Sequence, residues 1–158
     1  MNPNLTIRPM TSEDFAPLAT WMVTVPLWQR YGLTAERAVI NFAKAAEQGE
    51  VLVTADGDVP CCGFAWAIPK GAFGRSAYLR LIGVRPDYAG AGVGSRLLTY
   101  VEEAVLQYSS ELFLLVSDFN HEAQRFYQRH GYTQVGAIDG YVLPDVVELL
   151  FWRRLRPR

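Results

Sequence analysis

Cysteine is nearly absent from this sequence, and it has neither long hydrophobic runs nor an excess of one charge. The two cysteines, Cys61 and Cys62, are adjacent and form neither a CxxC pair nor a zinc-binding pattern. We interpret them as small apolar residues of a reduced, cytoplasmic protein. No segment reaches the roughly 18 apolar residues of a membrane-spanning helix, and nothing marks a secretion signal or a lipid anchor. We therefore expect no membrane partner.

The charge is almost balanced, with 15 basic and 16 acidic side chains and a formal net charge of −1. This balance argues against a protein that binds nucleic acid through bulk positive charge. The one basic run, near residues 153–158, is interpreted as a solvated chain end. Half of the 158 residues are hydrophobic, so we expect a single domain over residues 1–158 with its own core. No pattern of metal ligands is present, and we predict no metal site.

Hydrophobic periodicity predicts the element order β-α-α-β-β-β-α-β-α-β-β, without repeats or linkers. Residues 25–32 and 69–76 are expected to be irregular. The run at 112–116 is expected to be a central strand that is buried on both faces. A βαβ unit over residues 77–116 predicts two parallel strands with a right-handed crossover. The fold class is therefore α/β, or α+β, with one mixed sheet.

The strongest chemical signal is a glycine-rich loop after the strand at 77–84. Three alternating glycines over residues 90–94 lead directly into a helix. Glycine allows unusual dihedrals and close approach of a ligand, and a helix start offers unpaired N–H groups and the positive end of its dipole. Such a site suits a phosphate or pyrophosphate. Ser95 and Arg96 follow, so the Gly-Lys-Ser/Thr of a P-loop is missing, and the GxGxG spacing in mid-chain argues against a dinucleotide fold. A glycine-rich turn without a ligand is the structural alternative.

A second segment, residues 120–132, has the spacing of a helix that ends at a glycine. Alone it is typical of an ordinary amphipathic helix. Together the two segments resemble the GNAT superfamily of acyl-CoA N-acyltransferases. The first is similar to its coenzyme-binding motif, which consists of a strand, then V-x-P, then [Arg/Gln]-x-x-Gly-x-[Gly/Ala], and then a helix. The second is similar to N-x-x-A-x-x-[FL]-Y-x-x-x-G-[FY], matched at Asn120, Ala123, Phe126, Tyr127, Gly131 and Tyr132.

The resemblance implies a single GNAT-like domain, a central mixed sheet flanked by about four helices, with acetyl-CoA as acyl donor and coenzyme A as product. The backbone of Ile82, Gly83 and Val84 would pair with the pantetheine arm, and the Val84 N–H is the best donor to an oxyanion. Asn120 would contact the coenzyme. The pyrophosphate would be held by backbone amides of consecutive residues: Ala89, Gly90, Ala91, Gly92, Val93, Gly94 and Ser95.

The resemblance also implies that Tyr127 lies near the sulfur and protonates the leaving thiolate. A phenol with a pKa of about 10 is protonated at pH 7 and can donate to a basic leaving group. A core aromatic is the structural alternative for Tyr127.

Two features depart from the family pattern. Ala89 stands where the family has Arg or Gln, which removes a side-chain contact but leaves the backbone amides. The strands at 78–84 and 112–116 hold no acid, although many members carry a glutamate on the central strands. The amine could arrive neutral, or the base could be one of four candidates near the strand ends: Asp118, His121, Asp145 and Glu148.

Acceptor specificity in this family usually lies in the first helical pair and the last hairpin. Here these regions contribute aromatic residues and a few acids that suit a small or peptidic amine, with ordinary packing as the favoured structural alternative for each: Trp21, Trp28, Tyr31, Trp66, Phe73, Asp139, Tyr141 and Asp145. We expect direct attack by the primary amine of a small molecule in a ternary complex. The alternatives are a protein or peptide N-terminal or lysine acetyltransferase, and a non-catalytic acyl-CoA-binding sensor. We expect a monomer or homodimer.

Overall fold

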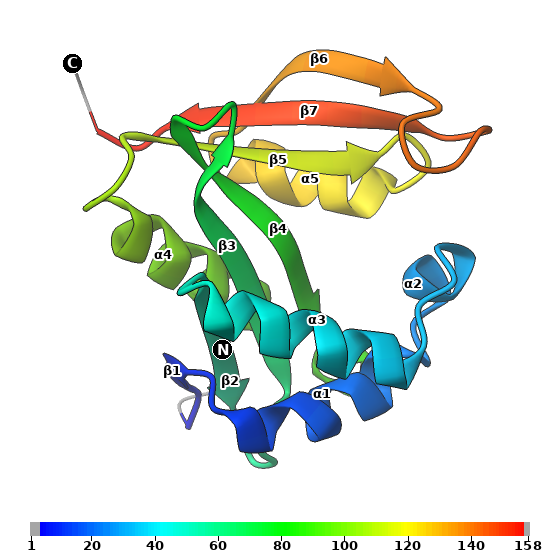
Figure 1. The fold of residues 1–158 in the computed structure, drawn as a ribbon, viewed down its shortest axis with the longest axis vertical. Coiled ribbons are helices and arrows are strands. Elements are labelled where there is room, and N and C mark those ends of the chain that lie inside the picture. The colour runs from blue at the N-terminus through cyan, green and yellow to red at the C-terminus, as the bar shows by residue number, and fades with distance from the viewer. Residues whose placement is uncertain (1–3, 157–158) are drawn as a thin grey trace. The chain divides into compact units, whose positions relative to one another are not determined.

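The computed structural model describes residues 4–156, and in this range seven strands form one mixed sheet (Figure 1). The hydrogen-bonded order is β1-β2-β3-β4-β5-β7-β6. The strands are β1 (Thr6–Pro9), β2 (Val51–Asp56), β3 (Gly63–Ala72), β4 (Ser76–Val84), β5 (Glu111–Ser117), β6 (Thr133–Asp139) and β7 (Val147–Arg154). The helices are α1 (Phe15–Met22), α2 (Pro26–Arg30), α3 (Ala35–Glu47), α4 (Val93–Val105) and α5 (His121–Arg129). Strands β4 and β5 are parallel, as predicted, and the mixed sheet confirms the α/β class.

Contacts divide the chain into two compact units, which are described separately. The first unit consists of the residues up to Ala67 together with Leu81–Ala104, and the second of Ile68–Arg80 together with the residues from Val105 onwards. The glycine-rich loop belongs to the first unit, and the 120–132 segment belongs to the second.

Aromatic rings form the core of the first unit. Phe42 of α3 stacks on Phe15 of α1, with ring centroids 5.6 Å apart, and meets Phe64 of β3 edge-on at 5.4 Å. Helix α4 contributes one buried apolar stripe, which confirms the sequence pattern: Val93, Leu97, Leu98 and Val101 in this unit, and Val105, which the division assigns to the second unit. Because the stripe begins at the first residue of α4, burial holds the helix start in place directly after the glycines.

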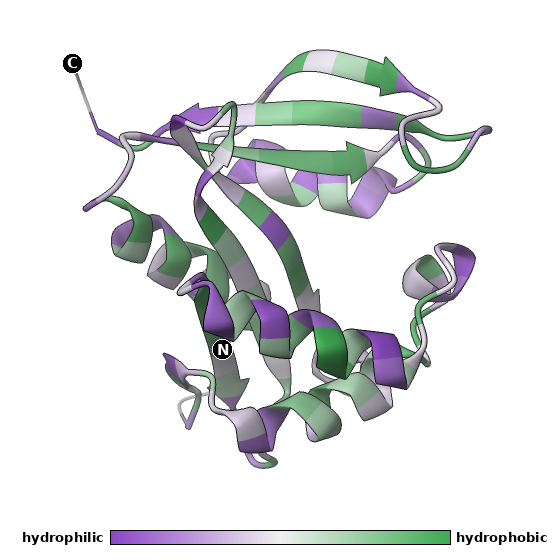
Figure 2. Ribbon diagram, in the orientation of Figure 1, coloured by the Kyte–Doolittle hydropathy of each residue, from purple (hydrophilic) through white to green (hydrophobic). Residues whose placement is uncertain are grey.

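The second unit places α5 against one face of β5 and β7. The Tyr127 ring of α5 lies 6.4 Å from that of Phe151 on β7. Figure 2 shows β5 hydrophobic along its length, whereas α5 is largely hydrophilic. Alternate β5 residues differ in burial: Leu112 and Leu114 are buried, but Phe113 is only half-buried. The expectation that this strand is buried on both faces was therefore wrong, since in the second unit α5 covers one face only.

Two segments expected to be irregular are partly regular. Residues 26–30 form the short helix α2, which starts at a proline whose fixed φ suits a first helical position. Strand β3 continues through Pro69 to Ala72. The turn to β4 is tight because Phe73 and Gly74 take positive φ values of 60° and 65°. A proline in a strand and an aromatic residue in left-handed backbone are both uncommon, so sequence patterns favoured a loop.

An ion network ties β1 to the start of α1 and the end of β2. Arg8 donates two hydrogen bonds to Asp14, at 2.8 and 2.9 Å, and its Nε donates to Asp56 at 2.6 Å. Asp14 is buried and also accepts the Thr11 N–H at 2.7 Å. The hydrogen bonds from the Arg8 guanidinium hold the pKa of Asp14 well below its usual range.

We expect Asp14→Asn to lower the free energy of unfolding by about 1–3 kcal/mol at pH 7, because a partly buried charge-assisted pair is lost. The depressed pKa means that Asp14 stabilises the fold fully above about pH 4, its unfolded pKa, and loses this effect as the pH falls. Urea denaturation at pH 7 and pH 3 should therefore show a difference from wild type that shrinks at pH 3. The exposed Asp58→Asn should match wild type at both pH values. A pH-independent difference would contradict this account.

Candidate active site

The glycine-rich loop lies between a short 3-10 turn at Pro86–Tyr88 and the start of α4. Gly90 and Gly92 have φ values of +80° and +83°, a region that side chains rarely adopt. A Cβ built on either glycine would meet nothing within 4 Å, so open space borders the loop backbone on that side. The loop therefore leaves room for a ligand at a helix N-terminus, the arrangement that binds phosphate groups.

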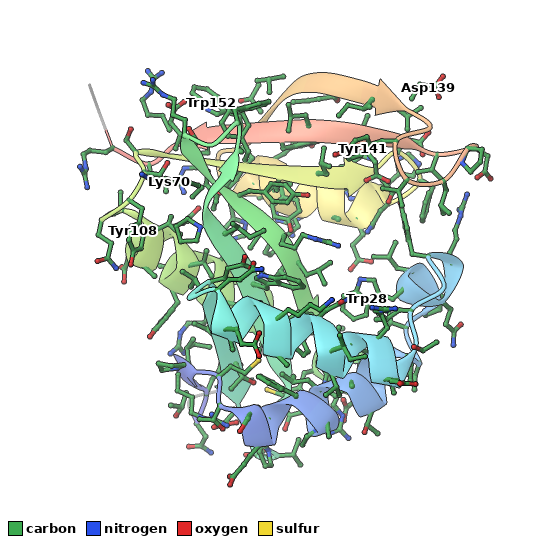
Figure 3. The ribbon with its side chains drawn as sticks, in the orientation of Figure 1. Trp28, Lys70, Tyr108, Asp139, Tyr141 and Trp152 are labelled. Atoms are coloured by element: carbon green, nitrogen blue, oxygen red, sulfur yellow. The ribbon has the colours of Figure 1, made fainter. Side chains whose placement is uncertain are left out.

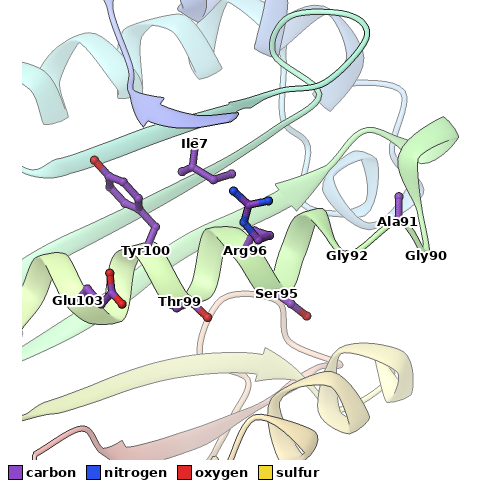
Figure 4. A pocket seen from close by; sticks show the side chains of 9 residues that line it. All are labelled: Ile7, Gly90, Ala91, Gly92, Ser95, Arg96, Thr99, Tyr100 and Glu103. Carbon is purple, nitrogen blue, oxygen red and sulfur yellow. The ribbon is translucent and has the colours of Figure 1, made fainter. Parts of the chain in front are cut away.

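A pocket of about 520 Å³ extends from this loop along α4 and is entirely within the first unit. Its lining combines glycine backbone, one cation, hydroxyl groups and one acid: Ile7, Gly90, Ala91, Gly92, Ser95, Arg96, Thr99, Tyr100 and Glu103. Figure 4 shows Arg96 and Tyr100 on the side of α4 that faces Ile7. The Arg96 guanidinium donates to the Leu5 carbonyl oxygen at 3.3 Å. Sequence reasoning quoted Arg96 only to exclude a P-loop; the pocket makes it a candidate for contact with an anion.

At the end of β4, the backbone groups on one edge of the strand lie beyond its registered ladder with β5. The registered ladder between β4 and β5 runs from Ala77↔Leu112 to Leu79↔Leu114, although β4 continues to Val84. The Arg85 N–H donates to the Cys62 carbonyl at 2.8 Å, beside β3. Successive N–H groups of a strand point to opposite edges, so the Val84 N–H points away from β3. This direction leaves the Val84 N–H suited to an extended ligand.

Gly83 and two predicted acceptor residues take part in the core of the first unit. A Cβ on Gly83 would lie 2.3 Å from the Trp28 ring and 2.8 Å from Phe64, so the close approach of Trp28 requires glycine there. Trp66 is buried, and its indole N–H donates to Glu50 Oε1 at 2.8 Å. Trp28 belongs to α2 (Figure 3), and its ring centroid is 5.8 Å from that of Phe64. Both tryptophans thus have packing roles, and contact with a substrate stays a prediction for each.

Helix α5 begins at Asn120, whose side-chain oxygen accepts the Ala123 N–H at 3.1 Å. This cap is the local reason for asparagine at the start of the motif; a contact with a coenzyme stays a prediction. Tyr127 is only 6% exposed and lies in an aromatic cluster with Phe126, Tyr132 and Phe151. No residue of the described chain hydrogen-bonds its hydroxyl.

The electrostatic setting of Tyr127 favours its protonated form. Burial raises the pKa of the Tyr127 phenol, and interaction with Tyr78 raises it further. Burial also raises the pKa of Tyr78, a β4 residue that sequence reasoning did not select. A phenol that stays protonated well above pH 7 can act as a proton donor.

The remaining candidates differ sharply in exposure. Tyr31 is half-buried, whereas Asp145 and Tyr141 are exposed, Tyr141 at 60%. Figure 3 shows Asp139, the last residue of β6, and Tyr141, which lies on the segment that connects β6 to β7. Among the four base candidates Asp118 is half-buried and His121 exposed, while Glu148 is the buried one.

Within residues 4–156 no cluster of His, Cys, Asp or Glu could hold a metal ion, and no helix is long and apolar enough to cross a membrane.

A mixed sheet with an open glycine-rich loop at the start of α4 is typical of acyl-group transferases, and comparisons with known proteins agree. The model of the acetyltransferase (GNAT) family matches residues 13–132. Thialysine N-epsilon-acetyltransferase of Bos taurus is 36% identical over 69 residues, which cover 43% of this chain and 41% of the relative. The match thus spans less than half the length of this curated relative.

Solved structures share the fold at low identity. YncA of Salmonella typhimurium, described as a putative acetyltransferase with acetyl-CoA, has a TM-score of 0.78 and 13% identity, and the match covers 98% of this chain and 96% of that one. An aminoglycoside 6'-N-acetyltransferase complexed with coenzyme A has a TM-score of 0.78 and 16% identity, with 97% and 98% coverage. This chain belongs to the acetyltransferase (GNAT) family. Membership of this family confirms the resemblance found in the sequence.

Proposed function

We propose that this protein transfers the acetyl group of acetyl-CoA to the primary amine of a small molecule, by direct attack in a ternary complex. The observation that carries the proposal is the open glycine-rich loop at the start of α4, which suits a diphosphate. A small amine is favoured because the matched relative is named for acetylation of thialysine. Turnover assays with thialysine and a panel of primary amines test it.

The residues present fit the coenzyme. Backbone amides from Ala89 to Ser95 hold its diphosphate, and Arg96 supplies positive charge in the same pocket. The edge of β4 at residues 82–84 pairs with the pantetheine arm, and the Val84 N–H donates to the thioester oxygen as negative charge develops there. The bound coenzyme supplies an activated acyl group. Tyr127 donates the proton that the departing thiolate needs.

Ala89→Arg tests how the loop holds the diphosphate. Ala89 is exposed, so a new arginine would make a solvent-screened contact. We expect acetyl-CoA to bind more tightly, by up to about tenfold (~1.4 kcal/mol), since charge-assisted contacts weaken when exposed. Isothermal titration calorimetry measures the change, with the exposed Ala35→Arg of α3 as a charge-matched control. If Ala89→Arg and wild type bind acetyl-CoA with equal affinity, the diphosphate does not lie close to the side chain of residue 89.

Two other functions make different predictions. A protein or peptide acetyltransferase acting on an N-terminus or a lysine would acetylate peptides and leave small amines unchanged. A sensor without catalysis is favoured by Ala89 and would bind acetyl-CoA but turn over no amine. We also propose a cytoplasmic location, a single domain and a monomeric or homodimeric state. Size-exclusion chromatography tests the oligomeric state.

A further inference from the structure

Strand β6 forms one edge of the sheet and belongs entirely to the second unit (Figure 1). It pairs with β7 on one side, and the part of the chain that the structure describes has no strand on its other side. An edge strand of this kind offers its outward N–H and C=O groups to a further strand. All of its residues are exposed except the half-buried Gly136, so this edge is accessible along its whole length.

The β6 edge has few of the features that prevent strands from associating. Proteins commonly protect such edges with lysine, proline, a bulge or a very short strand. The sequence of β6 is TQVGAID, which has no basic residue, no proline and a single acid, Asp139, at its last position. Its one irregularity, between Gln134 and Gly136, leaves regular pairing with β7 from Gly136 to Asp139. The strand at the other end of the sheet order, β1, is protected, because it has four residues that include Arg8 and Pro9.

Exposed apolar side chains gather on the same edge. Six large hydrophobic side chains of residues 4–156 are exposed, and four of them lie on β6 or in the segment that follows it. These four are Val135, Ile138, Tyr141 and Val142, with exposed fractions of 53%, 38%, 60% and 57%. Single exposed hydrophobic residues are ordinary on a protein surface, but a group of them indicates an interaction surface.

One hydrogen bond shows which backbone groups of β6 point outward. The Gly140 N–H donates to the Val146 carbonyl at 3.0 Å, in continuation of the register between β6 and β7. Backbone groups of successive strand residues point to opposite edges, so Ile138 directs its N–H and C=O towards β7. Ala137 and Asp139 therefore direct theirs to the free edge.

We propose that two copies of this chain form a dimer by antiparallel pairing of their β6 strands, with the two-fold axis at Ile138. Ala137 of one copy then exchanges two hydrogen bonds with Asp139 of the other, and the axis repeats this exchange. The two Ile138 side chains lie opposite each other in a non-hydrogen-bonded pair, the closer kind of cross-strand pair. The two Asp139 carboxylates lie on a diagonal, where repulsion between exposed charges is weak. Such an interface is self-complementary, because each copy contributes the same edge.

The charges near this edge favour a second copy as the partner. Arg129, at the last position of α5, precedes β6, whereas Asp139 and Asp145 lie at its end and after it. Antiparallel pairing reverses one copy, so the basic start of each edge approaches the acidic end of the other. The same register carries Val135 of one copy towards Tyr141 of the other and covers exposed apolar surface on both.

The first test measures the mass of the protein in solution by sedimentation equilibrium over a wide range of concentrations. We expect wild type to be a dimer that dissociates on dilution. Ala137→Pro removes an N–H group that only the dimer uses, once in each copy, and should weaken association by about 30-fold or more. Ile138→Lys places like charges opposite each other and should also shift the protein to monomer. Circular dichroism melting shows that each variant is folded.

Tyr108→Lys is the matched control for the charge change. Tyr108 belongs to the same unit and is 49% exposed, but it lies far from β6 in the sheet order, directly before β5. This variant also replaces an exposed hydrophobic side chain with a cation. It should therefore keep the association constant of wild type, which separates loss of the β6 edge from a general effect of added charge.

Cysteine cross-linking tests the register. The two native cysteines are buried, so an introduced cysteine is the accessible thiol. Ile138→Cys places two sulfurs at the axis, in a pair whose Cα separation of about 4.5 Å is within the range of a disulfide. Ala137→Cys is the control on the same strand, because its two copies are two positions apart along the ladder, beyond the limit of about 7 Å. We expect rapid formation of a disulfide-linked dimer for Ile138→Cys only.

Three results would overturn the inference. They are a wild type that stays monomeric at every concentration, a dimer that survives both Ala137→Pro and Ile138→Lys, and cross-linking of Ala137→Cys that is as fast as that of Ile138→Cys. The first result would leave this edge to a strand of a different protein. None of these measurements involves acetyl-CoA or an amine, so their failure would leave the proposed function intact, and a protein without turnover would still be expected to dimerise.

Discussion

Replacing Tyr127 with phenylalanine is expected to reduce turnover about 10²–10⁴-fold and to leave the affinity for acetyl-CoA unchanged. The substitution keeps the ring that packs on Phe151 and Tyr132 and removes only the hydroxyl. No described residue hydrogen-bonds that hydroxyl, so stability should barely change. Burial raises the pKa of the phenol, and loss of activity through ionisation of Tyr127 is therefore expected only above about pH 10. Steady-state kinetics, calorimetry and thermal melting together check these points.

Tyr132→Phe is the matched control for this experiment. Tyr132 lies in the same aromatic cluster, with its ring 5.7 Å from that of Tyr127, and it is also buried. Its hydroxyl has no proposed role in proton transfer, so turnover should stay near wild type. If Tyr127→Phe instead keeps full turnover and lowers the melting temperature, Tyr127 is a structural core residue. Acetyl-CoA binding by wild type without turnover of any amine or peptide would favour the sensor.

The features predicted correctly from sequence are those encoded by a short stretch of chain. The loop and the stripe of α4 follow from glycine conformation and helical spacing, and Gly131 ends α5 with a positive φ of 88°. Each of these signals lies within about one helix length. The fold class followed because element order restricts the topologies that a mixed sheet can adopt.

The features that sequence could not assign depend on tertiary contacts. Trp28 and Trp66 are typical of a substrate pocket by composition, but the structure packs both in the first unit's core. Glu148 could not be separated from Asp145, three residues away, until strand register put one in the sheet and the other in the loop. Tyr78 gave no signal at all, because its interactions with Glu148 of β7 and Tyr127 of α5 join positions that are far apart in the sequence. Register and long-range packing are not encoded in any local window.

Gly92→Val should abolish measurable binding of acetyl-CoA, with an affinity loss of at least about 100-fold (~2.7 kcal/mol). The space beside Gly92 is empty of protein atoms, so the valine side chain would occupy the volume that we assign to the diphosphate. At a ligand concentration of about 100 times Kd, wild type should gain about 2.7 kcal/mol, or roughly 5–10 °C in melting temperature. The variant should show no shift.

Backbone strain alone could mimic this result, because valine at a φ of +83° costs about 1–3 kcal/mol. Gly49→Val separates the two effects. Gly49 lies in the same unit, has a φ of +70° and also has no atom within 4 Å of a built Cβ, but it follows α3 and lies outside the pocket. Both variants should therefore melt below wild type by similar amounts, whereas only Gly92→Val should lose the shift caused by acetyl-CoA. A folded Gly92→Val protein that keeps the shift would show that the diphosphate is bound elsewhere, and equal loss in both variants would assign the effect to strain.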